Sequence, residues 1–215
     1  MYHYDYATPE EIKPARAELE QIISHVREDV RQYFTFRHEY IGSSSNKRNL
    51  VTYDPKTNVG FDFDVNLYVN DKYEDYSAAE IREIFRQSFN KFRFRYGYSP
   101  CENSTSVLTI KFIDRRQSRI KHSCDFAIVF DGSKGQQYIR FNKEQQTFSW
   151  EYRSKGFEGL EKKADWLKKH GLWNEVRDLY LYLKNTNTNP DRHSRSIYAE
   201  TINDLYNHHC IQKKS

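Results

Sequence analysis

The sequence has little of several residue types that mark particular protein classes. Its 215 residues include only eight glycines and five prolines, which excludes collagen-like and low-complexity chains. No apolar run approaches the roughly 18 residues that a membrane-spanning helix needs. The segment from Met1 to Tyr6 also lacks the apolar stretch of a secretory signal. We therefore expect a cytoplasmic protein that does not engage a membrane.

Cysteine is also scarce, and its spacing does not predict metal binding. Cys101, Cys124 and Cys210 are far apart, odd in number and form no Cys-x-x-Cys pair. Regular cysteine spacings are typical of disulfide frameworks and zinc sites, whereas scattered cysteines are typical of reducing compartments. The sequence therefore predicts three free thiols.

Charge and aromatic content exclude two further classes. The chain has 34 Lys and Arg against 30 Asp and Glu, and its net charge of +4 is far below that of a histone-like tail. Aromatic residues make up 16% of the chain, and their large burial energies exclude an intrinsically disordered protein. At about 150 residues per domain, the length predicts one domain, or one domain with a small appendage.

Local patterns predict the first helices and strands. Capping boxes at Thr8–Glu11 and Ser77–Glu80 mark two helix starts. After the first of them, apolar residues recur every three or four positions to about Tyr33, which predicts a long helix. Strict alternation then predicts a strand over 34–40 and a second, clearer strand over 61–69.

The chain changes character near Gly156. Before this point the patterns predict further strands, at 107–113, 124–130, 138–141 and 147–152. After it they predict helices, at 160–170, 172–183 and 194–207. We therefore predict an α/β fold, with a mixed sheet and a long N-terminal helix over 1–153 and a helical subdomain over 154–215.

Two carboxylates share one face of the clearest strand. Asp62 and Asp64 are two residues apart, which places their Cβ atoms roughly 6–7 Å from each other, while the opposite face of the strand is apolar. Two like charges this close repel, and a hard divalent cation would relieve the repulsion through oxygen ligands. Taken alone, Asp-x-Asp favours ordinary alternation on a half-exposed strand.

The neighbouring segments favour a chemical role for these aspartates. Gly42 allows close backbone approach at the end of a strand, and Ser43 supplies a hydroxyl and an N–H for a phosphate. Asp125 lies on a later β-like segment and could meet Asp62 and Asp64 on an adjacent strand. Three carboxylates, two metal ions and a phosphate cradle are what in-line nucleotidyl transfer needs.

This run of residues resembles the signature of the DNA polymerase β-like nucleotidyltransferase superfamily. The resemblance rests on Gly42-Ser43, on Asp62-Phe63-Asp64-Val65 and on Asp125, and covers roughly residues 10–130. The helical part resembles that of the oligoadenylate synthetase and bacterial cyclic-oligonucleotide synthase branch. Residues 44–61 make a longer gap before Asp62 than the family usually has, so we interpret 46–60 as an insertion.

The resemblance implies a metal-dependent nucleotidyltransferase that uses Mg²⁺ or Mn²⁺, takes an NTP and releases pyrophosphate. By position, Asp62 and Asp64 would bind both metal ions. Asp125 would bind the catalytic metal and help deprotonate the acceptor hydroxyl. Gly42 and Ser43 would hold the β- and γ-phosphates. The acceptor stays open among RNA, a small molecule and a protein.

Other interpretations remain. The chain could be a catalytically inactive nucleotide- or RNA-binding regulatory module on the same scaffold, with its chemistry lost through the insertion. A metal-dependent nuclease is weaker, because Thr109-Ile110-Lys111 lacks the acid that such enzymes place before the lysine. The basic stretch 111–121 could attract a triphosphate or a nucleic-acid backbone, or simply solubilise a loop. His122, near Asp125, is either functional or, more commonly for histidine, a loop side chain.

Overall fold

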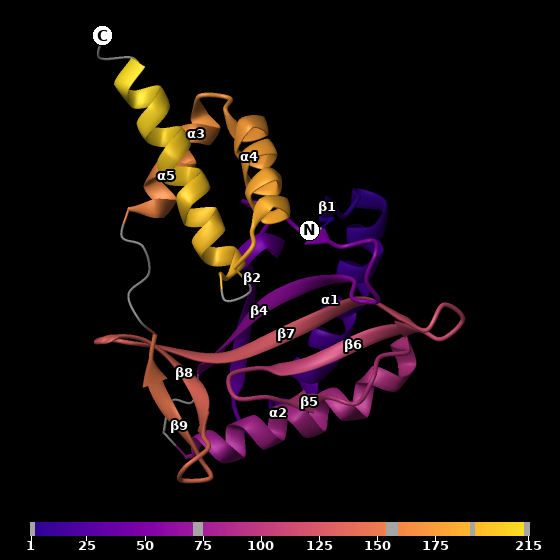
Figure 1. Cartoon of the computed structure of the whole chain (residues 1–215). Helices are drawn as coiled ribbons and strands as arrows, with labels where there is room; N and C mark the ends of the chain where they lie inside the picture. Colours follow the sequence, from indigo (N-terminus) through magenta and orange to yellow (C-terminus); the bar gives the residue numbers. More distant parts are fainter. Residues whose placement is uncertain (1–2, 71–74, 154–158, 190–191, 213–215) are drawn as a thin grey trace. The chain divides into compact units, whose positions relative to one another are not determined.

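The chain forms two compact units. The computed structural model describes residues 3–70, 75–153, 159–189 and 192–212 (Figure 1). Residues 6–153 form an α/β unit, whereas the first five residues group with residues 154–215 in a helical unit. The sequence places the boundary at residue 153. The residues that follow it, 154–158, lie outside the described residues.

The α/β unit is built on a mixed sheet. Its strands lie in the order β2-β4-β7-β6-β5, and β8 pairs with both β7 and β9. Only β4 and β7 run parallel; the other pairs are antiparallel. The strand bounds are β1 Asp5–Tyr6, β2 Thr35–Ile41, β3 Thr52–Tyr53, β4 Phe61–Asn70, β5 Glu102–Asn103, β6 Leu108–Asp114, β7 Arg119–Gly132, β8 Gly135–Asn142 and β9 Thr147–Tyr152. The predicted α/β class with a mixed sheet is confirmed.

Two capped helices belong to this unit. α1 spans Pro9–Val30 and α2 spans Ala78–Phe92, and each begins with the complete capping box that the sequence predicts. At both N-termini, a hydroxyl accepts a backbone N–H while the glutamate three residues later accepts the cap's N–H, so two unpaired donors are satisfied. Short 3₁₀ helices follow β2 (η1, Gly42–Ser44) and α2 (η2, Arg93–Tyr96).

The core lies between these helices and one face of the sheet. Leu19 of α1, Phe63 of β4 and Phe126 of β7 are all fully buried. The rings of Phe89 on α2 and Phe126 stack with their centroids 4.3 Å apart. Each such side chain contributes roughly 1.5–3 kcal/mol to the free energy of folding. This burial fixes the register of β4, because a shift by one residue would bury its aspartates.

In the described part of the helical unit there are three helices. α3 (Leu160–Lys169) and α4 (Trp173–Thr186) both contact α5 (Ser194–Gln212). The side chain of Asn185 ties the start of the chain to this unit, because it bonds the backbone N–H of Tyr4 at 2.6 Å and its carbonyl oxygen at 3.0 Å. Among the described residues, no helix has both the length and the apolar character that crossing a membrane requires.

The cysteines agree with the sequence-based prediction of free thiols. Cys101 and Cys124 are buried, Cys210 is half-buried, and none forms a disulfide. Burial raises the pKa of the Cys101 thiol to about 12, so it stays protonated at neutral pH.

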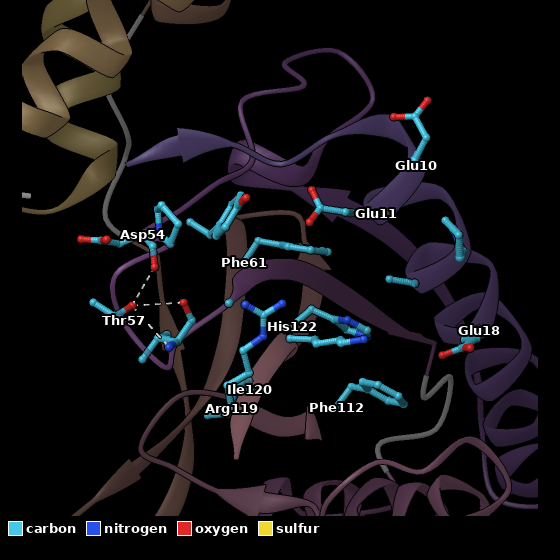
Figure 2. A pocket seen from close by; sticks show the side chains of 17 residues that line it. Glu10, Glu11, Glu18, Asp54, Thr57, Phe61, Phe112, Arg119, Ile120 and His122 are labelled. Carbon is cyan, nitrogen blue, oxygen red and sulfur yellow. Dashed lines mark hydrogen bonds between the residues drawn. The ribbon is translucent and has the colours of Figure 1, made fainter. Parts of the chain in front are cut away.

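The long segment before β4 folds back against the end of the β6–β7 hairpin. Ile120 N–H donates to the Asn58 carbonyl at 2.9 Å. A Cβ on Gly60 would lie 1.8 Å from the Lys121 carbonyl oxygen, so this approach requires glycine. Together with the first half of α1, these segments enclose a cavity of about 350 Å³ (Figure 2).

Candidate functional site

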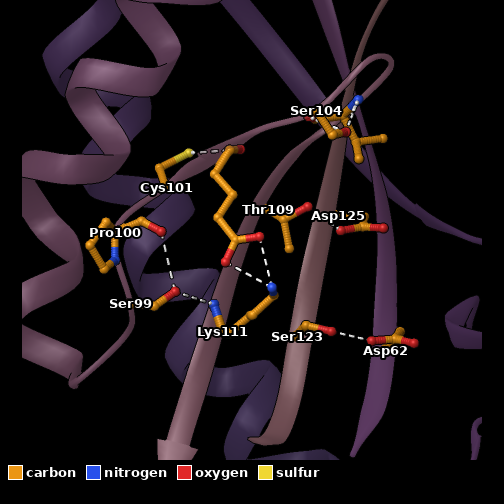
Figure 3. A network of polar contacts seen from close by, with 11 residues as sticks. Asp62, Ser99, Pro100, Cys101, Ser104, Thr109, Lys111, Ser123 and Asp125 are labelled. Carbon is orange, nitrogen blue, oxygen red and sulfur yellow. Dashed lines mark hydrogen bonds and ion pairs between the residues drawn. The ribbon is translucent and has the colours of Figure 1, made fainter. Parts of the chain in front are cut away.

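The parallel pairing of β4 and β7 brings the three aspartates onto neighbouring strands. Asp64 lies in register with Asp125. Asp62 lies in register with Ser123, and Figure 3 shows this second pair. Side chains of register partners point to the same face, so Asp62, Asp64 and Asp125 all lie on the face of the sheet opposite the helices. We call this side of β4 and β7 the acidic face. The structure therefore brings Asp62, Asp64 and Asp125 together.

Two hydroxyl groups orient the carboxylates of Asp62 and Asp125. Thr109 Oγ1 on β6 donates to Asp125 Oδ1 at 2.5 Å, and Ser123 Oγ on β7 donates to Asp62 Oδ1 (Figure 3). Hydrogen bonds to an ionised carboxylate are stronger than those between neutral groups. They therefore hold both side chains against the sheet.

Asp64 lies in the least favourable electrostatic position of the three. Burial, with added repulsion from Asp125 and Asp62, raises the pKa of Asp64 to about 6, and the Arg153 guanidinium opposes this shift. Burial also raises the pKa of Asp125, although the Thr109 hydrogen bond counteracts it. A positive charge at this position would therefore be favourable.

Gly42 lies directly against Asp64. Its φ is +61°, and a Cβ on Gly42 would lie 2.6 Å from Asp64 Oδ2. The close approach that the sequence assigns to Gly42 is thus present, although Ser43 is separated from Asp62 by a long loop. Ser43 is half-buried, and its carbonyl oxygen accepts the Leu50 N–H at 3.0 Å.

Ser44 holds the end of β2 to β4, a role that sequence reasoning missed. Its side chain is 1% exposed, and its hydroxyl donates to the Ile41 carbonyl at 2.9 Å and accepts the Asp64 N–H at 3.1 Å. Arg16 of α1 fixes the same turn by donating to the Ser44 carbonyl oxygen. The sequence has three consecutive serines here, and nothing in their order indicates which one turns inward.

Asn66 and Arg153 complete the acidic face and were also missed. Asn66 lies two residues beyond Asp64 on the same face and is only 2% exposed. Arg153 donates to Asn66 Oδ1 and to Gln136 Oε1, both at 2.9 Å. Arg153 is 87 residues from Asn66 in the chain, so no local pattern could pair them.

The remaining sequence candidates lie elsewhere or are already paired. Lys111 binds Glu102 at 2.7 Å and Lys121 binds Asp114 at 3.3 Å, so salt bridges offset part of the basic stretch. His122 is 6% exposed, which contradicts its interpretation as a loop side chain. It is the register partner of Phe61 and faces the helix-covered side, away from Asp125. Burial against three aromatic rings explains this correction.

The residues on the acidic face fit a hard divalent cation by their chemistry. Searched over the described ranges, the chain has no His, Cys, Asp or Glu group of three or more already arranged to hold a metal ion. The three carboxylates nevertheless supply the oxygen atoms that Mg²⁺ and Mn²⁺ prefer. A bound cation would also relieve the repulsion that raises the pKa of Asp64.

Comparison of the sequence with models of known families and with curated proteins finds no match. The structure, in contrast, is similar to solved structures of DncV. The Vibrio cholerae DncV cyclic AMP-GMP synthase with the linear intermediate 5′ pppA(3′,5′)pG gives a TM-score of 0.59 at 11% identity, covering 83% of this chain and 60% of that one.

Two further DncV structures extend the likeness. The Vibrio cholerae form bound to 3′-deoxy GTP gives a TM-score of 0.63 at 12% identity, covering 93% of this chain and 67% of that one. The Escherichia coli form bound to 3′-deoxy GTP gives 0.55 at 15% identity, covering 93% and 54%. This chain spans about 60% of the length of the Vibrio cholerae synthase with the linear intermediate. At such identities the likeness establishes the fold, and the predicted nucleotidyltransferase-type fold is confirmed.

Proposed function

We propose that this protein is a metal-dependent nucleotidyltransferase of the DNA polymerase β-like superfamily. It would transfer an NMP from an NTP to a hydroxyl acceptor and release pyrophosphate, with residues 1–153 as catalytic core and 154–215 as helical subdomain. One observation carries the proposal. Asp62, Asp64 and Asp125 share one face of β4 and β7, with Gly42 against Asp64, on a fold that DncV uses with nucleotides bound.

The acidic residues divide the work. Asp62 and Asp64 would hold both ions, and Asp125 would hold the ion on the acceptor side. Bound Mg²⁺ or Mn²⁺ supplies Lewis-acid chemistry, which neutralises the triphosphate and activates the hydroxyl. Burial raises the pKa of Asp125, which makes this carboxylate a better acceptor for the hydroxyl proton.

Other groups would position the substrate and the acids. The backbone of Gly42 and the hydroxyl of Ser43 would bind the β- and γ-phosphates, because both lie in the turn beside Asp64. Ser44 would keep this turn in contact with β4 through the Asp64 N–H. RNA, a small molecule and a protein all remain candidates for the acceptor.

The test is turnover with labelled nucleotides. The full chain is incubated with each NTP and Mg²⁺ or Mn²⁺, and pyrophosphate and labelled product are measured. We expect release that falls at least about a hundredfold, or about 2.7 kcal/mol of barrier, in Asp62→Asn/Asp64→Asn. Asp131→Asn is the control, because Asp131 is an exposed acid of β7 that binds Arg37 instead.

The same experiment separates enzyme from regulatory module. NTP binding without pyrophosphate release, for every NTP and class of acceptor tried, would favour the inactive module. The long loop is not by itself an argument for that alternative, because it leaves Gly42 in contact with Asp64.

A further inference from the structure

A cavity lies on the side of β4 and β7 opposite the three aspartates. Phe61 and His122 are register partners that directly precede Asp62 and Ser123, so their side chains point to the other face. There they line the cavity of about 350 Å³ with α1 and the segment 53–60 (Figure 2). This volume is within the range of small-molecule sites, roughly 300–1,000 Å³. The insertion, the basic stretch and His122, which the acidic face does not use, all meet here.

One wall of the cavity carries a carboxylate without a counter-charge. Glu18 of α1 is half-buried, and it forms no hydrogen bond or ion pair in the described part of the chain. Burial raises its pKa, which means that the site lacks compensation for its negative charge. Glu10 lies two turns earlier on the same helix and also lines the cavity. Because the Glu10 carboxylate points away from the other lining side chains (Figure 2), Glu18 is the carboxylate that a ligand would meet.

The floor of the cavity is aromatic and contains a buried ring nitrogen. The His122 ring stacks on Phe112 at 5.2 Å and on Phe61 at 5.5 Å between centroids. Its Nε2 bonds the Tyr98 hydroxyl at 2.7 Å, whereas Nδ1 has no hydrogen-bond partner among the described residues. Burial lowers the pKa of His122 to about 4, so the ring is neutral near pH 7. The direction of this bond depends on the ring tautomer: in the tautomer with its hydrogen on Nε2, that N–H donates to Tyr98 and Nδ1 is a hydrogen-bond acceptor.

The basic side chains that line the cavity do not neutralise its carboxylates. Lys121 forms a salt bridge at 3.3 Å with Asp114, which does not line the cavity. Arg119 is exposed and is the one lining cation that makes no ion pair within the described ranges. The Arg119 guanidinium points toward the other lining side chains (Figure 2), but the lining residues include four carboxylates against Arg119 and Lys121.

We propose that this cavity binds a small molecule through a protonated amine. The ammonium group pairs with Glu18 and donates an N–H to His122 Nδ1, in the ring tautomer that carries its hydrogen on Nε2. Its alkyl part packs on Phe61 and Phe112, whose ring faces attract a cation. Such a ligand would satisfy the unpaired carboxylate and the unpaired ring nitrogen together. This site would be separate from the nucleotide site and needs no turnover to be detected.

Calorimetric titration of the full chain tests the proposal. The probes are butylamine, putrescine and spermidine as chlorides, with sodium butyrate and inorganic phosphate as anions at matched ionic strength. We expect saturable binding of amines and none of the anions. Glu18→Gln should weaken amine binding at least tenfold, or about 1.4 kcal/mol. The matched control is Glu28→Gln on the same helix, where Glu28 is exposed and binds Arg31 at 3.7 Å.

Arg119→Gln provides a test of opposite sign. Removing this like charge should tighten amine binding several-fold, and thermal melting confirms that each variant folds. The proposal is overturned if no amine gives saturable heat, or if Glu28→Gln weakens binding as much as Glu18→Gln. It is also overturned if phosphate or butyrate binds and Arg119→Gln abolishes that binding, because the cavity is then an anion site.

Discussion

At the scale of single residues, Asp64 combines burial with repulsion from two neighbouring acids. Its pKa of about 6 reflects burial first, then the negative charges of Asp125 and Asp62. An ionised carboxylate in such a place opposes folding at neutral pH. Strongly shifted groups of this kind cluster at functional sites, where a substrate or cation supplies the missing compensation.

Replacing Asp64 should stabilise the metal-free protein at neutral pH. Because the folded-state pKa lies above the usual value of 3.8, the folded state binds more protons between about pH 4 and 6. The group's contribution is therefore complete below that window and is lost as pH rises through 6. We expect Asp64→Asn to raise the free energy of unfolding by about 1–3 kcal/mol at pH 7.5, with little effect at pH 4.

Urea unfolding in the presence of a chelator measures this difference. Asp131→Asn serves as control, because Asp131 is exposed and salt-bridged to Arg37 at 2.8 Å. Loss of stability in Asp64→Asn at pH 7.5 would contradict the assigned repulsion.

Gly42 is the second residue whose identity is dictated by the acidic face. Gly42→Ala would place a methyl group 2.6 Å from Asp64 Oδ2 and also strain a backbone with φ of +61°. Gly171→Ala is a matched control, because φ there is +73° but nothing lies within 4 Å of the new Cβ. Both variants should lose about 1–3 kcal/mol of stability from backbone strain. Only Gly42→Ala should also lose most pyrophosphate release.

Melting temperature and turnover are measured for Gly42→Ala and Gly171→Ala under identical conditions. Equal activity in the two alanine variants would mean that contact with Asp64 does not matter for catalysis.

At the scale of elements, the proposed function assigns different roles to the parallel strands β4 and β7. β4 carries Asp62 and Asp64 beside the Gly42 turn, whereas β7 carries Asp125 beside β6. In the proposed function, the first strand serves mainly the triphosphate and the second serves the acceptor hydroxyl. The two strands should therefore respond differently to mutation.

Asp125→Ala should lose catalysis while keeping nucleotide binding. Activation of the acceptor is an interaction made mainly in the transition state, so its loss lowers kcat with little change in affinity. We expect NTP affinity within roughly tenfold of the wild type, or about 1.4 kcal/mol. Pyrophosphate release should fall at least about a hundredfold, or roughly 2.7 kcal/mol of barrier.

Calorimetric NTP titration and pyrophosphate release are compared on both proteins. If Asp125→Ala turns over like the wild type, Asp125 is not the third carboxylate.

At the scale of the whole molecule, binding of nucleotide and metal should increase the free energy of unfolding. A ligand that binds only the folded state adds RT ln(1 + [L]/Kd), about 2.7 kcal/mol at 100 Kd. We expect NTP with Mg²⁺ to raise the melting temperature of the wild type and to leave that of Asp62→Asn/Asp64→Asn unchanged. An equal rise in the double variant would show that the nucleotide binds away from the acidic face.

The sequence by itself determined what depends on neighbours along the chain. Thr8–Glu11 and Ser77–Glu80 form their capping boxes, and 147–152 is a strand with the predicted bounds. The alternation over 61–69 placed Asp62 and Asp64 on one face, because side-chain direction in a strand follows from its two-residue period. The functional roles of these residues remain predictions.

Only the tertiary structure decided what depends on register between distant segments. The pairing of β4 with β7 sets Asp64 beside Asp125, and packing in the turn after β2 selects Ser44 as the serine that bonds Asp64. Arg153 reaches Asn66 across 87 residues, and His122 is buried between rings from β4 and β6. Such contacts arise when apolar faces are buried together, and burial depends on the whole fold, which no local pattern along the chain contains.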